Sequence, residues 1–269
     1  MSFQPVLPTA GLSGWRFLQR TLPMQSQAFA KAPALQRDTA YFEQKIGTIK
    51  TADDLVSDRR LLRVTLGAFG LQSDIDSRAF IRKVLADGVE DPKALSNRLT
   101  DERYKKLAQA FGFGAATPPR TGQPGFGQQI AEMYRRQQFE VAVGDQDETL
   151  RLALNADRDL PDLAAGSGSE NARWFRIMGT PPLRTVFETA FGLPKGFGRL
   201  DVDQQREVFR DKARQQIGME SLDQLADPAM RDKLIQRYLL RASVAESMAT
   251  GPGAIALTLL QGAGFNRFR

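Results

Sequence analysis

The side chains that most often perform catalysis at neutral pH are missing from this sequence. Its 269 residues include no histidine and no cysteine. There is therefore no imidazole to act as a general base, no thiolate nucleophile, and no histidine or cysteine ligand for zinc. What remains is the chemistry of carboxylates, lysine, tyrosine and serine, or the binding of a hard cation by oxygen ligands. The composition thus disfavours an enzyme and leaves a carboxylate-dependent hydrolase or lyase as the catalytic alternative.

Two groups of aspartates are the candidates for that chemistry. The first group could surround a cation and consists of Asp145, Asp147, Asp157, Asp159 and Asp162. Its spacing lacks the ordered ligand positions and central glycine of an EF-hand, so solvated helix caps explain it better. The second group, Asp201 and Asp203, stands directly before a segment with helical spacing, where a carboxylate caps the helix. Because no Walker-type phosphate-binding motif is present either, we predict no catalytic residue, metal or cofactor.

Two tryptophans and two arginines are the candidates for an interface with a protein partner. They are Trp15, Arg16, Arg20 and Trp174. Helical spacing over residues 13–22 places Trp15, Leu18 and Leu22 on one side and the arginines elsewhere. Such a helix can dock on a partner or a membrane surface, or its apolar face can pack on the chain's own core. Both interpretations stay open at this point.

Signals for helix starts and helix ends recur along the whole chain. Capping residues precede apolar runs with helical spacing, and glycine follows those runs. Residues 51–54 resemble a capping box that begins a helix, and the apolar stripe of this helix continues to Gly70. Further helices are predicted to begin at Asp76, Asp91, Thr100, Asp147, Thr180, Asp203 and Asp227. The sequence therefore predicts an all-α, multi-helical fold.

A segment that cannot continue a helix divides the predicted helices into two groups. Residues 112–127, GFGAATPPRTGQPGFG, combine several glycines and prolines, which favours a loop or linker. The chain is accordingly divided into a basic and partly flexible N-terminal segment (1–37), a helical unit (38–113), a Gly/Pro-rich loop (114–127), a second helical unit (128–249) and a basic C-terminal tail (250–269).

One type of helix ending is repeated in both helical units. The tripeptide Ala-Phe-Gly occurs at 68–70, 110–112 and 190–192, each time at the end of an amphipathic segment. Alanine permits close approach, phenylalanine anchors the last turn, and glycine takes the left-handed conformation that ends a helix. Further matches follow the same order in the two halves, such as FEQKIG at 42–47 and FEVAVG at 139–144. We therefore predict an internal duplication that produced two related helical units.

The positive charge of the chain lies at its two ends. Residues 1–37 hold four basic side chains, residues 250–269 hold two, and neither segment has an acidic one. These six charges equal the net charge of +6, so residues 38–249 are balanced. Basic termini that bind nucleic acid or an acidic partner are therefore the alternative function. A nucleic-acid binder would more often carry a basic stripe with aromatic residues on its folded domain, so protein partners are favoured.

Nothing in the sequence indicates a membrane span or a cleaved secretion signal. No stretch approaches the roughly 18 apolar residues that a transmembrane helix requires. The first basic residue is Arg16, so the N-terminus lacks the charged region and apolar stretch of a secretory signal. We expect no transmembrane segment and a cytoplasmic location, unless the protein leaves the cell by a route without a cleaved signal.

Four short motifs occur in a characteristic order along the second half of the chain. They are RLALN at 151–155, Arg-Trp at 173–174 followed by Met178, AFGLP at 190–194 and LDVDQQ at 200–205. As a set they resemble a bacterial family of unknown function whose genes are often found among flagellar genes. The resemblance covers residues 15–245 and carries over no catalytic role, because the family has no established activity. It implies a flagellar context, with flagellar components as partners and a flagellar route as a means of export. Together with the repeat, the missing histidine and cysteine and the acid-free termini, it leads us to expect a non-enzymatic structural, assembly or accessory protein associated with the flagellum.

Overall fold

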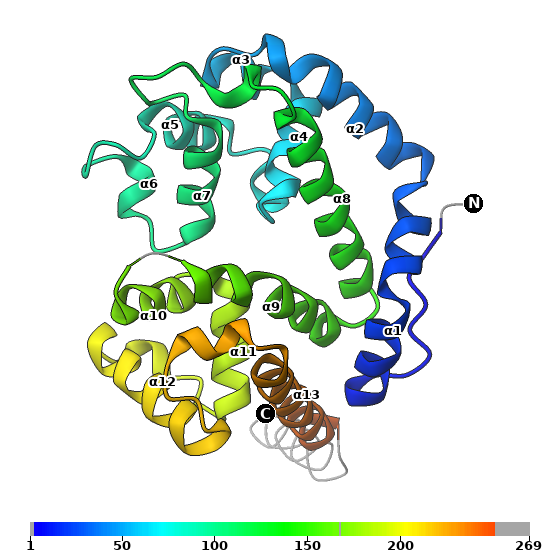
Figure 1. Cartoon of the computed structure of the whole chain (residues 1–269), viewed down its shortest axis with the longest axis vertical. Helices are drawn as coiled ribbons and strands as arrows, with labels where there is room; N and C mark the ends of the chain where they lie inside the picture. The colour runs from blue at the N-terminus through cyan, green and yellow to red at the C-terminus, as the bar shows by residue number, and fades with distance from the viewer. Residues whose placement is uncertain (1–2, 167, 251–269) are drawn as a thin grey trace, which may run out of the picture.

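The computed structural model describes residues 3–166 and 168–250. Within these residues the chain forms thirteen α-helices and no β-strand, which confirms the predicted all-α, multi-helical fold. The helices build two lobes, one above the other in Figure 1, and we call them the upper and the lower lobe. None of the helices in the described part of the chain combines the length and the apolar character needed to cross a membrane.

The upper lobe contains helices from the first half of the chain. They are α2 (Pro33–Lys45), α3 (Ala52–Ser57), α4 (Arg59–Ala68), α5 (Arg78–Asp87), α6 (Leu95–Arg98) and α7 (Glu102–Phe111). The lower lobe contains α9 (Glu148–Ala165), α10 (Glu170–Met178), α11 (Pro181–Phe191), α12 (Val202–Ile217) and α13 (Pro228–Thr250). Two long helices, α1 (Gly11–Ala30) and α8 (Phe126–Gly144), lie on one side of the molecule, and α8 passes from the upper lobe to the lower one (Figure 1).

The helix α8 contributes to the hydrophobic cores of both lobes. Its first half buries Ile130 and Tyr134 in the upper core, and its second half buries Phe139 and Val143 in the lower core. Gly67 on α4 permits a close approach to α8, since a Cβ at this position would lie 2.5 Å from Cε2 of Tyr134. The lobes are thus joined by a continuous helix that each of them packs against.

The lower core is aromatic and includes the N-terminal helix. Trp174 stacks on Phe209 with ring centroids 6.2 Å apart and meets the ring of Phe187 edge-on at 5.8 Å. From α1, Trp15 and Leu18 are fully buried in the same core. The helix α1 therefore packs against side chains that follow it by more than a hundred positions in the sequence.

The two cores do not coincide with the predicted helical units. Residues 128–144 of the second unit lie in α8, which serves both lobes, and α1 precedes the first unit but joins the lower core. The two cores formed by helix packing therefore contain other residues than the two units that the Gly/Pro-rich loop at 114–127 separates. Residues 251–269, nearly all of the predicted basic C-terminal tail, lie outside the described residues.

The repeated Ala-Phe-Gly helix endings have the predicted conformation. Gly70, Gly112 and Gly192 have φ angles of 70°, 68° and 65°, so all three are in the left-handed region that glycine adopts without steric cost. The phenylalanines before them are buried in the core of their lobe. The three confirmed endings show that the same tripeptide ends a helix with the same glycine conformation at each site. The internal duplication itself stays a prediction.

The predicted single helix from Thr51 to Gly70 is divided into two. Thr51 forms the expected capping box with Asp54, but the helix ends at Ser57. Asp58 then has an extended conformation (φ −94°, ψ 101°), and its carboxylate accepts hydrogen bonds from the backbone N–H groups of the next helix. Asp58 also accepts a hydrogen bond from the hydroxyl of Tyr41 at 2.7 Å. The break thus coincides with a cap that Asp58 forms within its own segment and with a contact to α2, and neither was predicted.

Several predicted helix starts are shifted because a neighbouring residue performs the capping. Asp101 rather than Thr100 caps α7, and Asp201 rather than Asp203 caps α12. At the predicted start at Asp91 the chain makes a turn, and the helix α6 begins only at Leu95. The starts at Asp147 and Asp227 are confirmed by α9 and α13. The existence of a helix was thus predicted more reliably than its first residue.

Candidate functional site

A cleft of about 360 Å³ lies between the lobes. Its walls come from the end of α4, from α7, α8 and α9, and from the first turn of α11. Figure 1 shows that α8 and α9 meet at an angle, so these helices form two adjoining sides of the cleft. The lobes also meet away from this corner, where the backbone N–H of Glu102 donates to the carbonyl oxygen of Gly179 at 3.0 Å. The lobes are therefore held together at this contact as well as along α8.

Both lobes contribute apolar side chains to the cleft. Phe69 and Met133 come from the upper lobe, and Leu152 and Pro182 come from the lower lobe. Met133 and Leu152 are only partly buried, and each packs at the margin of the core of its lobe. The cleft therefore retains an apolar surface that neither core covers completely.

A buried ion pair joins α8 to α9 at the side of the cleft. Nη1 of Arg158 lies 2.8 Å from Oε1 of Glu140, and Nε of Arg158 donates to Oδ1 of Asp159 at 2.9 Å. The amide oxygen of Gln137, in the orientation that satisfies its hydrogen bonds, accepts from Nη1 and Nη2 of Arg158 at 2.7 and 2.9 Å. Only 16% of the Arg158 side chain and 6% of the Glu140 side chain are exposed. The guanidinium thus has acceptors on both helices and holds them together.

Burial changes the protonation behaviour of this pair. It raises the pKa of the Glu140 carboxyl to about 7, although the charge of Arg158 opposes the shift. Burial by itself would lower the pKa of Arg158, but the charges of Glu140 and Asp159 outweigh this effect and raise it. Arg158 therefore stays charged, whereas Glu140 changes its charge near neutral pH.

The raised pKa of Glu140 predicts a pH-dependent contribution to stability. The Glu140 carboxyl of the folded protein holds its proton up to about pH 7, whereas a glutamate carboxyl in the unfolded chain releases its proton near pH 4.5. The free energy of unfolding should therefore lose a contribution as the pH rises through this range. Relative to the variant Glu140→Gln, we expect the wild type to lose about 1–3 kcal/mol between pH 4.5 and pH 8. Urea unfolding of both proteins at the two pH values measures this difference, and an equal difference at both values would contradict the assignment.

Five cationic side chains line the cleft, and three of them are closely held by protein acceptors. The five are Arg103, Lys106, Arg136, Arg151 and Arg158. Besides Arg158, Arg103 is held by the carboxylate of Asp101 and by the carbonyl oxygen of Gly70. The Nε atom of Arg151 donates to Glu148 at 2.6 Å. These three arginines have structural partners within the chain.

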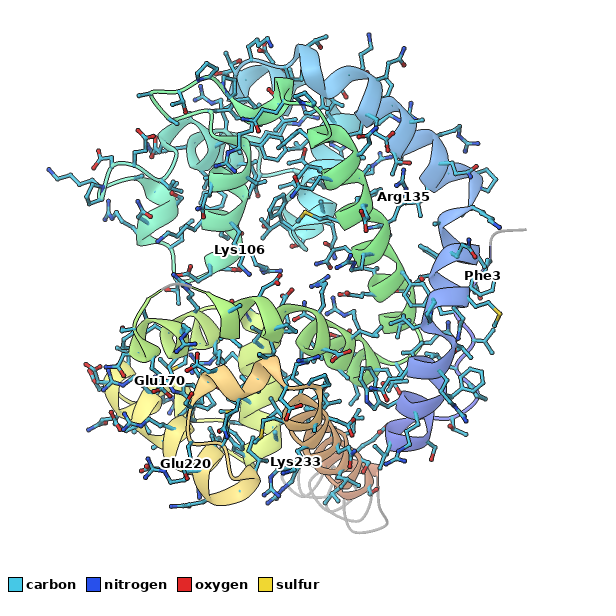
Figure 2. The ribbon with its side chains drawn as sticks, viewed as in Figure 1. Phe3, Lys106, Arg135, Glu170, Glu220 and Lys233 are labelled. Carbon is cyan, nitrogen blue, oxygen red and sulfur yellow. The ribbon has the colours of Figure 1, made fainter. Side chains whose placement is uncertain are left out.

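The other two cations remain available at the rim of the cleft. Lys106 forms no ion pair with any residue that the structure describes. Figure 2 shows it on α7, on the side toward the lower lobe. Within residues 3–166 and 168–250, Arg136 on α8 forms an ion pair only with Glu132, at 3.5 Å, and both of these side chains are more than half exposed. Such an exposed pair contributes little free energy, so the guanidinium of Arg136 is free to take another partner.

One buried polar atom in the wall of the cleft lacks a partner. Asn155 on α9 is 8% exposed, and its amide nitrogen donates to Oδ2 of Asp159 at 3.4 Å. Its amide oxygen accepts no hydrogen bond from any residue that the structure describes. A buried acceptor without a donor costs about 1–3 kcal/mol, so this atom lowers the stability of the wall.

The structure separates the four predicted interface residues into two pairs. Trp15 and Trp174 are 0% and 1% exposed, so both rings lie inside the lower core of the chain itself. Arg16 and Arg20 are exposed on α1 and form no ion pair with the described residues. None of the four lines the cleft. The tryptophans are therefore not surface groups here, and the two arginines remain candidates for an interface.

The two predicted groups of aspartates are dispersed among several roles. Asp147 and Asp201 cap helices, as expected for these positions, and Asp157 pairs with Arg231 at 3.3 Å. Asp159 and Asp162 line the cleft. In the described part of the chain, no three acidic side chains are grouped so as to hold a metal ion.

Sequence reasoning did not identify Glu140 and Arg158. A signal was present, because each charged residue lies within a helical turn of buried apolar side chains, Phe139 and Leu154 respectively. Ionised side chains are almost never buried unless they are paired, so a charge at such a position indicates a partner. The sequence does not show which residue that partner is.

Comparisons with known proteins identify a family and a similar structure. Residues 68–230 match the model of a family described as "Protein of unknown function (DUF1217)". The fold is similar to the crystal structure of a protein from Agrobacterium tumefaciens, with a TM-score of 0.72, 27% identity, and coverage of 88% of this chain and 97% of that one. A comparison with curated proteins found no match. All the residues that line the cleft lie within the matched range.

Proposed function

The chain belongs to the DUF1217 family of proteins of unknown function, and we propose that it is a non-enzymatic assembly or accessory protein of the bacterial flagellum. It acts by binding protein partners, either in the cytoplasm or after export by a flagellar route without a cleaved signal. The flagellar context rests on the sequence resemblance given above. The binding role rests on the cleft between the lobes.

The binding role is supported by the difference between the polar groups of the cleft that are paired within the chain and those that are not. The two most buried charged groups, Glu140 and Arg158, are paired with each other and connect α8 to α9. The apolar side chains and the rim cations Lys106 and Arg136 are left to contact an occupant. Strongly shifted pKa values also occur in structural ion-pair networks, so the shift at Glu140 fits a scaffold as well as it fits catalysis.

Deletion of the gene in a motile bacterium that carries it tests the flagellar role. We expect reduced swimming, restored by the wild-type gene on a plasmid but not by the empty plasmid. Affinity purification of the full-length tagged protein from motile cells should recover flagellar components, and the same purification from a non-flagellated strain is the control. Normal swimming together with normal filaments in the deletion strain would exclude the flagellar part of the proposal.

Binding of nucleic acid or an acidic partner through the basic N-terminal segment is the second candidate. It is favoured by Arg16 and Arg20, which are exposed and form no ion pair with the described residues. Because Trp15 lies in the lower core, charge reversal is a better test than removal of the segment. A fluorescence titration with labelled DNA at low salt should then show binding that weakens steeply with salt and is lost in the double variant Arg16→Glu/Arg20→Glu. Equal binding by this variant would exclude the segment.

A further inference from the structure

We propose that the cleft between the lobes binds a short acidic segment of a protein partner, which also places an apolar side chain between the lobes. This inference rests on the proposed function, because it assumes that the protein acts by binding other proteins. It specifies the place of binding and the chemistry of the bound segment.

The apolar part of the cleft requires an occupant with an apolar side chain. Phe69 and Met133 of the upper lobe and Leu152 and Pro182 of the lower lobe line it. An occupant that enters the cleft removes apolar surface of both lobes from water at once, which contributes roughly 25 cal/mol for each Å² buried. At about 360 Å³ the cleft is near the lower end of ligand pockets, which span roughly 300–1,000 Å³. Only a short segment therefore fits inside.

The available charge at the rim favours carboxylates in the bound segment. Lys106 has no ion-pair partner among the described residues, and Arg136 has only an exposed one. The carboxylates inside the cleft are less available, because Glu140 and Asp159 already bind Arg158. Asp162 is exposed and has no ion-pair partner among the described residues. The two weakly held cations, Lys106 and Arg136, therefore outnumber this one carboxylate, which favours carboxylates in the bound segment.

The two requirements are met together by a peptide with acidic and apolar side chains. The C-terminal segment 250–269 of this chain does not meet them, since it contains two arginines and no acidic side chain. The charge therefore favours a separate protein over this segment.

Selection from a phage-displayed library of random twelve-residue peptides tests the proposal with the full-length protein. The library is first passed over the double variant Lys106→Glu/Arg136→Glu, which removes the phage that bind this variant. The remaining phage are then selected for binding to the wild type. We expect enriched peptides with a net negative charge and at least one large apolar residue. Their affinity, measured by fluorescence polarisation of labelled synthetic peptides, should fall about tenfold or more in the double variant. Circular dichroism verifies that both proteins are folded.

A further variant assigns the binding to the cleft. The variant Arg16→Glu/Arg20→Glu has the same change in charge outside the cleft and should bind the peptides within about twofold of the wild type.

Three results would overturn the proposal. They are the absence of any enriched peptide, the enrichment of basic peptides, and equal binding by the wild type and the Lys106→Glu/Arg136→Glu variant. A loss of binding in the Arg16→Glu/Arg20→Glu variant would instead place the contact on α1 and would equally exclude the cleft. The selection uses no flagellar component, so a failed selection says nothing about the flagellar role. That role is tested separately by the motility of the deletion strain, and the failure of either proposal can therefore be recognised.

Discussion

Replacement of Arg158 with methionine is expected to lower the free energy of unfolding by about 3–5 kcal/mol at pH 8. The substitution leaves the Glu140 carboxylate buried, with only 6% of its side chain exposed, and without its cationic partner. A buried charge that loses its partner retains the full cost of desolvation and regains none of it from attraction. The loss should be smaller at pH 5, where the Glu140 carboxyl already holds its proton and carries no charge that needs a partner. Urea unfolding followed by circular dichroism at both pH values measures the effect.

The double variant Glu140→Gln/Arg158→Met is the matched control for this prediction. It removes both buried charges, so it should recover most of the stability that Arg158→Met loses. Asp159 also loses a contact, but 22% of its side chain is exposed and water can solvate it. If the double variant is as unstable as the single one, the loss comes from packing of the arginine side chain and not from an unpaired charge.

Replacement of Trp174 with alanine is expected to cost about 3–5 kcal/mol of unfolding free energy. The ring is 1% exposed and packs between Phe209, which it stacks against, and Phe187, which it meets edge-on. Alanine would leave a cavity in the aromatic centre of the lower core that the surrounding helices can fill only in part. The same unfolding measurement at neutral pH gives the loss.

The variant Trp174→Phe separates the aromatic packing from the indole N–H. The indole N–H of Trp174 donates no hydrogen bond, since it has no acceptor among the described residues. Phenylalanine keeps a ring against Phe209 and removes an unsatisfied donor, so it should lose less than half of what alanine loses. A phenylalanine variant as unstable as the alanine variant would show that the indole N–H has a partner in solution.

Features that depend on neighbouring residues in the sequence were predicted well. The capping box at Thr51 and the left-handed glycines at 70, 112 and 192 are decided within a few residues, by side-chain caps and by the steric freedom of glycine. The all-α class follows from the same local signals. The break at Asp58 was not predicted, although Asp58 caps the next helix through the backbone of Arg60 and Leu61; only its contact with Tyr41 comes from a different helix.

The candidate site could not be predicted from the sequence because it depends on how α8 meets α9. Glu140 and Arg158 belong to different helices, and their ion pair exists only when the angle between these helices brings them together. The apolar wall combines Phe69 with Pro182, which are far apart in the chain. For Trp15 and Trp174 the sequence did not decide between an interface with a partner and burial in the chain's own core, because tryptophan is common in both places.

The burial of α1 in the lower core has a consequence for synthesis of the chain. Trp15 and Leu18 leave the ribosome well before Leu150 and Leu234, which belong to the same core. Domains generally fold from the N-terminus during synthesis, but this helix has to wait until nearly all the described residues are available. Until then its apolar face cannot pack into the core that buries it in the folded chain.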